Sequence, residues 1–331
     1  MDRHFGEIDS LAPGVLSPFS LASEISYQSW REAKLANYPR SIDEIRVPVA
    51  DLALPDQVER TQIMNAMVRC NMAIYFCQPG LPEERSPVRR RALAGFLAHF
   101  NLRSVEKHRS AEDDGFVAIE VSAAPQKRGF IPYSSRSLNW HTDGYYAPPE
   151  TAIRAMLLHC VKSASAGGEN ALLDPEIAYI RLRDSNPKWI EALMHPRAMT
   201  IPASSEEDGS ERPVSVGPVF AIDPTDGSLL MRYTARGRNI IWRDDADTRA
   251  AIGFLEHLLV ESEESLILKA RLAPGEGLIC NNVLHTRTAF EEAAGTHRRL
   301  YRARFATRVT DVAALGASGA RKSSNRIGTH S

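Results

Sequence analysis

Strand-like segments occupy both ends of the chain, and helical segments are inserted between them. Alternating or apolar runs predict strands at IRVPVADL, MAIYFCQP, FVAIEVSA, TAIRAMLLHCV, SLILKARL, LICNNVL and RRLYRARFATRV. Helical periodicity predicts helices near residues 57–70, 87–100, 175–182, 187–194 and 245–261. Strands and helices do not alternate regularly, and no glycine-rich loop joins a strand to a helix. The pattern therefore argues against a Rossmann or P-loop fold and predicts two facing sheets with helices outside them.

The composition is that of an ordinary globular protein. The chain has 331 residues, of which 43% are hydrophobic and 24% charged, and its formal net charge is −1. A net charge this small gives no broad electrostatic surface for nucleic acid. No run approaches the roughly 18 apolar residues of a membrane span, and MDRHFGEIDS lacks the apolar core of a secretion signal. We expect a cytoplasmic protein without a transmembrane segment; peripheral binding at the inner membrane and homo-oligomerisation stay open.

The chain divides into three parts. Residues 1–44 are expected to form an irregular N-terminal extension, and residues 45–312 a single domain. Residues 313–331 are small and polar, which is typical of a disordered tail. The four cysteines show no C-x-x-C spacing and predict reduced thiols rather than a zinc site or a disulfide framework.

Two polar motifs offer metal ligands. In SLNWHTDGYY, His141 and Asp143 are two residues apart, so a strand would point both to the same face. A polar surface turn fits this pair equally well. A third ligand is available in His285, which ends the apolar run NNVL and enters a Thr-Arg-Thr turn. Two histidines and one carboxylate with open positions would suit ferrous iron.

The last strand carries a cluster of arginines. Strand alternation places Arg298, Arg302 and Arg304 on one face of THRRLYRARF. Buried guanidinium groups are costly unless they meet anions, so this face could bind an acidic ligand. An exposed edge strand whose charges prevent aggregation explains the same residues equally well.

Together these segments resemble a known enzyme family. HTDGYY, GGENALLDPEIAY, HTRTAF and RRLYR, in this order and spacing, are similar to the TauD/TfdA group of Fe(II)/2-oxoglutarate-dependent dioxygenases, from about residue 45 to residue 309. The resemblance implies a mixed, β-rich fold with a double-stranded β-helix core (jelly-roll, cupin-like) and flanking helices. It implies Fe(II) as cofactor and 2-oxoglutarate and O2 as co-substrates. The reaction would hydroxylate an unactivated C–H bond and convert 2-oxoglutarate to succinate and CO2.

The resemblance also assigns roles to residues. His141, Asp143 and His285 would bind the iron. Arg298 would hold the distal carboxylate of 2-oxoglutarate. Asn170, in GGEN, stands where many relatives have a threonine that touches this co-substrate, and its amide can also donate a hydrogen bond. Because halogenating relatives lack the carboxylate, Asp143 argues against halogenation.

The loop before His285 departs from the family pattern. Relatives usually show Asp-Asn several residues before this histidine and a glycine after it. Here the preceding residues are Cys280, Asn281 and Asn282, and Thr286 follows. The departure concerns the conformation of the loop and not the ligand itself.

The substrate is less determined than the reaction. Arg302 stands where relatives of the taurine dioxygenase kind bind a substrate anion; further candidates for the substrate site are Tyr145, Tyr146 and Arg232. The two tyrosines could equally well pack on a neighbouring strand. LNWHTDGYY and GGENALLD also resemble enzymes that hydroxylate the Kdo sugar of lipopolysaccharide, an acidic sugar of a glycolipid. The alternatives are a small free acid such as taurine or glutarate, and a metal-free β-sandwich that only binds a ligand.

Overall fold

The computed structural model describes residues 17–77, 86–103, 114–122, 131–205, 211–261, 266–294 and 297–313. The helices are α1 (Glu24–Asn37), α2 (Gln57–Cys70), α3 (Ser86–His99), α4 (Pro175–Ser185), α5 (Pro187–Met194) and α6 (Ala246–Glu261), with short 3-10 turns at η1 (Ile42–Ile45), η4 (Ile131–Tyr133) and η5 (Pro149–Thr151). The strands of the two larger sheets are β1 (Arg46–Pro48), β2 (Met72–Phe76), β3 (Val117–Ile119), β4 (Leu138–His141), β5 (Ala155–Lys162), β7 (Asn170–Leu173), β15 (Leu268–Ala270), β16 (Glu276–Cys280), β17 (Leu284–Arg287) and β19 (Arg299–Phe305). The remaining short strands are β6 (Ala166–Gly167), β8 (Met199–Ile201), β9 (Ser204–Ser205), β10 (Glu211–Arg212), β11 (Ser215–Gly217), β12 (Phe220–Ile222), β13 (Leu229–Met231), β14 (Ile241–Trp242) and β18 (Phe290–Glu291).

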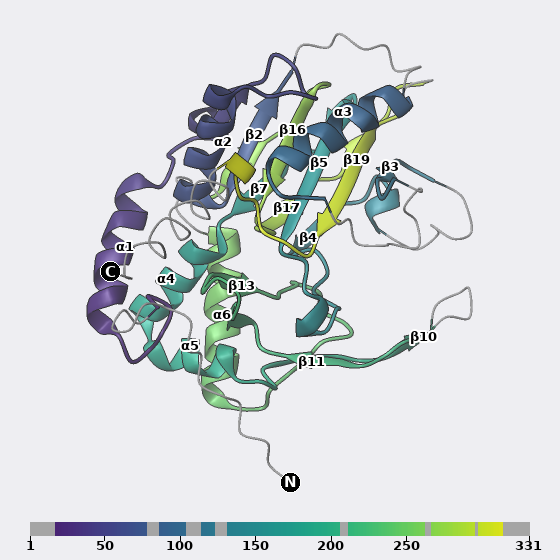
Figure 1. Ribbon diagram of the computed structural model, residues 1–331. Coiled ribbons are helices and arrows are strands. Elements are labelled where there is room, and N and C mark those ends of the chain that lie inside the picture. Colours follow the sequence, from purple (N-terminus) through teal and green to yellow (C-terminus); the bar gives the residue numbers. More distant parts are fainter. Residues whose placement is uncertain are drawn as a thin grey trace, which may run out of the picture.

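The larger sheet has six strands in the order β1-β2-β16-β5-β19-β3. Only β1 and β2 are parallel; the other neighbours pair antiparallel. Helix α3 lies across one face of this sheet (Figure 1), where the rings of Tyr75 and Phe96 pack with their centroids 4.6 Å apart. On the same face, Tyr301 of β19 packs against Phe116. Alternation along β19 therefore directs Arg302, the next residue, to the opposite, inner face.

The second sheet has four antiparallel strands in the order β15-β7-β17-β4. Strand β17 is central, and its register places His285 directly opposite His141 of β4. The two sheets meet near this pair, because Arg302 of the six-stranded sheet lies 3.6 Å from Asp143, which follows β4. The fold is thus mixed α/β with several antiparallel sheets, and both larger sheets contribute to one region.

Local sequence signals explain where the helices begin and end. Helix α2 starts at a capping box in which the side chains of Asp56 and Glu59 each accept a hydrogen bond from the other's backbone N–H, and it ends at Asn71 with φ +58°. Helix α5 starts with a proline after Asn186, whose side chain accepts a hydrogen bond from the N–H of Lys188. The bounds of both helices match the residues predicted from the sequence.

The segment before residue 45 differs from the expected irregular extension, because it contains helix α1. The buried side of α1 is formed by Tyr27 and Lys34, whereas Ile25 is 88% exposed. The Nζ atom of Lys34 lies 2.6 Å from a carboxylate oxygen of both Asp174 and Glu176. Because an aromatic ring and a buried ion pair hold this helix, its sequence lacks the apolar stripe by which an amphipathic helix is recognised. The expected tail lies outside the described residues, except for residue 313.

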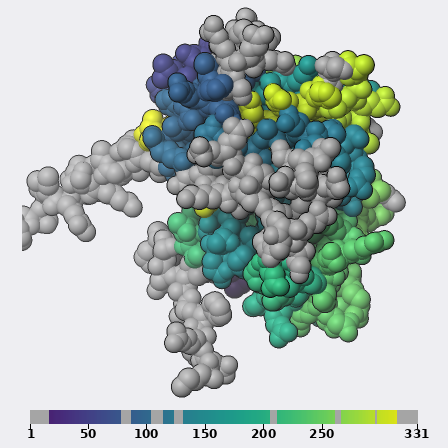
Figure 2. Space-filling view, turned by 90° about the vertical axis from the view of Figure 1, so that its right-hand side faces the viewer, coloured from purple at the N-terminus to yellow at the C-terminus, as the bar shows by residue number. Residues whose placement is uncertain are grey.

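Strands from the N-terminal and C-terminal parts of the described chain lie together in one region of the molecule. In the space-filling view, the blue N-terminal and yellow C-terminal residues share the upper part, and green residues lie below them (Figure 2). This arrangement follows from the six-stranded sheet, which joins β1 and β2 to β16 and β19. Among the described residues, none of the helices combines the length and apolar character needed to cross a bilayer.

Candidate active site

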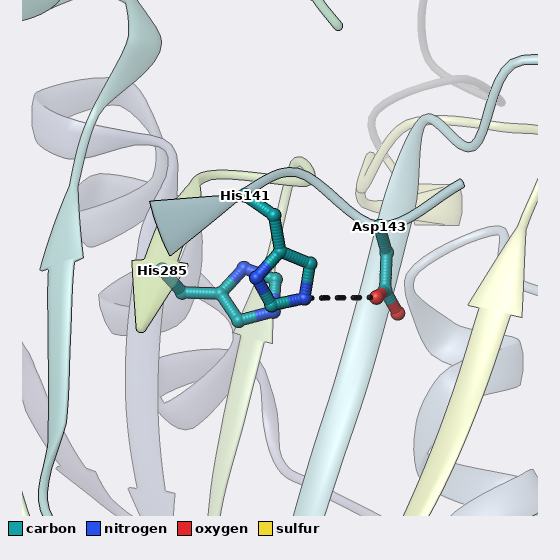
Figure 3. Close-up of side chains that lie close together, drawn as sticks. All are labelled: His141, Asp143 and His285. Carbon is teal, nitrogen blue, oxygen red and sulfur yellow. Dashed lines mark ion pairs between the residues drawn. The ribbon is translucent and has the colours of Figure 1, made fainter. Parts of the chain in front are cut away.

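Three side chains with metal-binding atoms converge where β4 ends and β17 begins. His141 is the last residue of β4, Asp143 lies in the turn after it, and His285 lies on β17. All three are buried, and their ligand atoms lie within 4.8 Å of one another. The Nε2 atom of His141 is 3.7 Å from Oδ1 of Asp143, and the two imidazole rings lie side by side (Figure 3). The structure therefore brings together the three residues that the sequence suggested as ligands.

Backbone carbonyl groups fix both imidazole rings. The Nδ1 atom of His141 is 2.8 Å from the carbonyl oxygen of Asn139, and Nδ1 of His285 is 2.9 Å from that of Val283. A carbonyl oxygen only accepts hydrogen bonds, so each Nδ1 carries the proton and each Nε2 offers its lone pair. Burial, and after it the nearby His141, lower the pKa of His285 to about 4, so this ring is neutral at pH 7.

The carboxylate of Asp143 is charged and available. Burial alone would raise its pKa, but the positive charges of Arg302 and Arg304 hold that pKa well below the usual range. Its Oδ2 atom is buried and accepts no hydrogen bond from the described residues. A buried carboxylate oxygen without a donor, beside two free imidazole nitrogens, fits a divalent metal ion such as Fe(II).

Arg298 and Asn170, the predicted co-substrate residues, line one pocket. This pocket is lined from both larger sheets, by residues that include Cys160, Gly168, Asn170, Arg271, Arg298 and Leu300. The guanidinium of Arg298 is buried and lies over the ring of Phe290, 5.0 Å from its centroid. Gly168 has φ +73°, and a Cβ there would lie 3.6 Å from Nε of Arg298. The pocket thus presents a buried cation to any ligand that enters it.

The two tyrosines after Asp143 lie next to the cluster. The ring of Tyr145 meets His141 edge-on, with centroids 6.4 Å apart, and its other side contacts Tyr146. The hydroxyl of Tyr146 accepts a hydrogen bond of 3.0 Å from Nη1 of Arg304. Both tyrosines are partly exposed, which places them at the edge of the site rather than in the core.

Arg232 has a different environment from the one expected for a substrate residue. Its Nε donates to the carbonyl oxygen of Tyr145 at 2.7 Å, and its Nη1 donates to that of Met199 at 3.2 Å. Its Nη2 donates to both oxygens of Ser215. This guanidinium therefore holds the loop that carries Tyr145, and a direct contact with substrate stays a prediction.

Asn282 and Arg287 are both buried near the cluster, and no role had been predicted for either of them from the sequence. Asn282 makes three hydrogen bonds with the backbone of Asp143 and of Ile153. Arg287 donates to the carbonyl oxygens of Ser134 and Arg136, in the loop before β4. The only sequence signal for them was position, since each lies within three residues of His285. Their partners are distant in the chain and appear only once it has folded.

Curated proteins of similar sequence act on a phosphorylated nucleoside, according to their names. A uridine-5'-phosphate dioxygenase from Amycolatopsis sp is 31% identical over 177 residues, which are 50% of this chain and 60% of that protein. A second uridine-5'-phosphate dioxygenase, from Streptomyces sp, is 29% identical over 194 residues, which are 55% of this chain and 67% of that protein. The first match therefore spans less than two thirds of its relative.

Solved structures share the fold. A taurine dioxygenase from Burkholderia xenovorans aligns over 81% of this chain and 89% of its own, with a TM-score of 0.50 and 18% identity. The PvcB protein from Pseudomonas aeruginosa aligns over 82% of this chain and 88% of its own, with a TM-score of 0.51 and 16% identity. Residues 84–304 match the family described as taurine catabolism dioxygenase TauD, TfdA family. With its buried His-Asp-His cluster, the chain belongs to this family of oxidoreductases, which use Fe(II) and 2-oxoglutarate.

Proposed function

We propose that this enzyme hydroxylates a C–H bond of a nucleoside 5'-monophosphate, with uridine 5'-phosphate as the first candidate. The observation that carries the proposal is the position of Arg302. Its Nη1 lies 3.6 Å from Oδ2 of Asp143, and its side chain is only 12% exposed. A cation so close to the metal ligands selects a substrate whose anionic group binds beside the reacting carbon.

The iron would be held by Nε2 of His141, a carboxylate oxygen of Asp143 and Nε2 of His285. When bound, Fe(II) supplies the reduction of dioxygen that is coupled to decarboxylation of 2-oxoglutarate, giving succinate, CO2 and one oxygen atom in the substrate. Asn139 and Val283 would keep both rings in the ligating tautomer through their carbonyl groups.

The two acids of the reaction would bind to different arginines of the same strand region. Arg298 would pair with the distal carboxylate of 2-oxoglutarate, with Asn170 at the other wall of the pocket. Arg302, four residues further along, would pair with the phosphate. Arg304 also favours an anionic substrate. Its positive charge helps to lower the pKa of Asp143, and its Nη1 donates a hydrogen bond to the hydroxyl of Tyr146.

A phosphate is favoured over the other anions considered from the sequence. The named relatives act on uridine 5'-phosphate, and their similarity exceeds that of the taurine dioxygenase structure. The Kdo sugar of lipopolysaccharide and small acids such as taurine or glutarate offer the same negative charge to Arg302. They are therefore competing outcomes of one assay, and a membrane-associated acidic sugar has no support from the named relatives.

The fold supports the same assignment. We propose that the two larger sheets form the double-stranded β-helix core that the family resemblance implies. Residues 45–312 would then be one dioxygenase domain, which contains all of the family match at residues 84–304.

The test measures succinate formed from 2-oxoglutarate by the Fe(II)-loaded protein. The substrate panel contains uridine 5'-phosphate, other nucleoside 5'-monophosphates, uridine, taurine, glutarate and a Kdo-containing lipid. We expect succinate formation to rise with uridine 5'-phosphate and not with uridine, which lacks the phosphate. Mass spectrometry of the nucleotide product then shows which carbon has been oxidised.

Two outcomes would contradict the proposal. Coupled turnover of taurine, glutarate or the Kdo lipid, without turnover of any nucleotide, would assign a different substrate class. If no Fe(II)- and 2-oxoglutarate-dependent visible absorption band forms under anaerobic conditions, and the His285→Ala variant binds ligands as the native protein does, the chain is a metal-free binding protein.

A further inference from the structure

We propose that Asn282 is a positioning residue that fixes the carboxylate ligand Asp143 relative to the imidazole ligand His285. This inference rests on the metal centre in the proposed function, but not on the identity of the substrate. Asn282 is itself buried, with 6% exposure, and the hydrogen bonds of its side chain are made with backbone groups of Asp143 and Ile153. It therefore acts on the metal centre through Asp143.

The side chain of Asn282 makes the two backbone hydrogen bonds that a neighbouring strand would otherwise make with Asp143. Its Oδ1 accepts a hydrogen bond of 2.8 Å from the N–H of Asp143, and its Nδ2 donates to the carbonyl oxygen of the same residue at 2.9 Å. Strand β4 ends at His141, so Asp143 lies beyond the paired part of the sheet. One primary amide thus satisfies both backbone groups of a residue that has left the strand ladder.

A third hydrogen bond completes the arrangement. The same Nδ2 donates to the carbonyl oxygen of Ile153 at 2.7 Å. The side chain of Ile153 also packs against the turn, because a Cβ at Gly144 would lie 2.5 Å from its Cγ1 atom. Gly144 has φ +69° and follows Asp143 directly. The turn that carries the carboxylate is therefore in contact with both Asn282 and Ile153, and position 144 has no space for a residue larger than glycine.

The same short segment also orients His285. Asn282 is three residues before His285, and between them Val283 provides the carbonyl oxygen that lies 2.9 Å from Nδ1 of the imidazole. The segment from Asn282 to His285 consequently fixes one ligand through a side-chain amide and the other through a backbone carbonyl. A displacement of this segment would change the distance between Asp143, in the turn after β4, and His285 on β17.

Asparagine is the residue type that this position requires. Its φ of +50° is a left-handed conformation that asparagine and glycine adopt more readily than other residues. Aspartate has no donor for the two carbonyl groups, and glycine has no side chain. Only asparagine combines the backbone conformation with one acceptor and two donors at this reach.

The adjacent residue provides a matched control. Asn281 is also an asparagine, but its Nδ2 donates to Oδ1 of Asn71 and its Oδ1 accepts from the N–H of Val309. Neither contact involves a metal ligand. The same substitution at both positions therefore separates the general effect of removing a side-chain amide from the specific effect of removing the amide that contacts Asp143.

The experiment compares Asn282→Gly with Asn281→Gly in the full chain. Metal affinity is measured by anaerobic Fe(II) titration, and coordination geometry by the visible spectrum of the Co(II)-loaded protein. Thermal unfolding of the metal-free protein reports any general loss of stability. For Asn282→Gly, which tolerates the positive φ, we expect about 10- to 100-fold weaker Fe(II) binding and an altered Co(II) spectrum. Asn281→Gly should keep the native affinity and the native spectrum.

Asn282→Asp is the second variant, because it keeps the size and one acceptor but loses both donors. It should also alter the Co(II) spectrum. Native Fe(II) affinity and a native spectrum in the Asn282 variants would overturn the proposal, as would equal losses at Asn281. Failure of every Asn282 variant to fold would make it a folding residue instead. None of these measurements needs a substrate, so the result holds even if the proposed substrate is wrong. Native metal binding by His285→Ala, in contrast, would reject the proposed metal centre itself.

Discussion

The two larger sheets contribute different kinds of chemistry to the site. The four-stranded sheet supplies two imidazoles, and the turn after β4 supplies a carboxylate. Backbone carbonyl groups fix both imidazoles, and the side chain of Asn282 holds the backbone of Asp143. The six-stranded sheet supplies guanidinium groups from β19 and the residue before it, and side chains or rings contact them. The contact between Asp143 and Arg302 joins the two sets.

The difference follows from what each ligand demands. A metal ion needs three atoms at nearly fixed positions, and strand ends held by backbone hydrogen bonds provide them. Organic anions need charge and donors at the right distance, and buried arginines provide these at a cost that a bound anion offsets. Removing a metal ligand on the four-stranded sheet should therefore abolish the reaction, whereas removing an arginine of the six-stranded sheet should weaken one binding step.

The largest effect is expected for His285→Ala. Loss of one of three protein ligands should weaken Fe(II) binding by at least about 100-fold and abolish succinate formation. The measurement is the anaerobic absorption band that forms with Fe(II) and 2-oxoglutarate, followed by the turnover assay. His195→Ala, which alters a histidine at the end of α5, serves as the control and should retain both signals. A His285→Ala variant with the native band would assign the metal to other residues.

The next effect is expected for Arg298→Gln. Charged hydrogen bonds contribute roughly 1.5–3 kcal/mol, so the KM for 2-oxoglutarate should rise by about 10- to 100-fold. Iron affinity in the absence of 2-oxoglutarate should not change. The matched control is Arg299→Gln, because Arg299 is the next residue but its Nε donates to Glu120 and its side chain is 46% exposed. Equal effects in both variants would show that the whole strand end matters and not the buried guanidinium.

A separate effect on the substrate is expected for Arg302→Gln. The KM for uridine 5'-phosphate should rise by about 10-fold or more, while the KM for 2-oxoglutarate stays within a few-fold of the native value. Arg302→Lys should recover part of the loss, because it keeps the charge but not the two-pronged geometry. A change confined to the KM for 2-oxoglutarate would exchange the roles assigned to Arg302 and Arg298 and remove the contrast between the two anion sites.

The metal-ligand cluster beside the four-stranded sheet and the limits of two helices could be predicted from local sequence signals. His141 and Asp143 were recognisable as a pair because strands direct alternate residues to one face, and His285 because an apolar run ends there. The limits of α2 and α5 follow from caps that the sequence displays, such as Asp56 and the proline after Asn186. These signals are local, and a short stretch of sequence contains all of their partners.

What could not be predicted depends on contacts between distant segments. Helix α1 escaped notice because Lys34, not an apolar side chain, anchors it to Asp174. Arg232 stays a predicted substrate residue, but its hydrogen bonds to the oxygens of Tyr145, Met199 and Ser215 form only in the folded chain. In the sequence, Asn282 was noted only because the loop before His285 differs from the family pattern. Its hydrogen bond with Asp143 joins residues that are 139 positions apart. Periodicity does not encode such distances, so these residues emerge only from the structure.

The smallest effect is expected for Tyr146→Phe, which tests whether the turn after β4 contributes to anion binding. The change removes the hydroxyl that accepts the 3.0 Å hydrogen bond from Nη1 of Arg304 and leaves the ring in place. An ordinary hydrogen bond contributes about 0.5–1.5 kcal/mol, so the KM for uridine 5'-phosphate should change by about 2- to 10-fold.

Kinetics with Tyr146→Phe should show this change without any shift in Fe(II) affinity or in the KM for 2-oxoglutarate. The combination with Arg302→Gln is informative, because two residues that act on one phosphate should give a non-additive double variant. Additive losses would mean that Tyr146 and Arg304 act on another part of the substrate, such as the sugar or the base. An unchanged KM would confine the tyrosine to packing, and the anion site would then consist of groups from the six-stranded sheet alone.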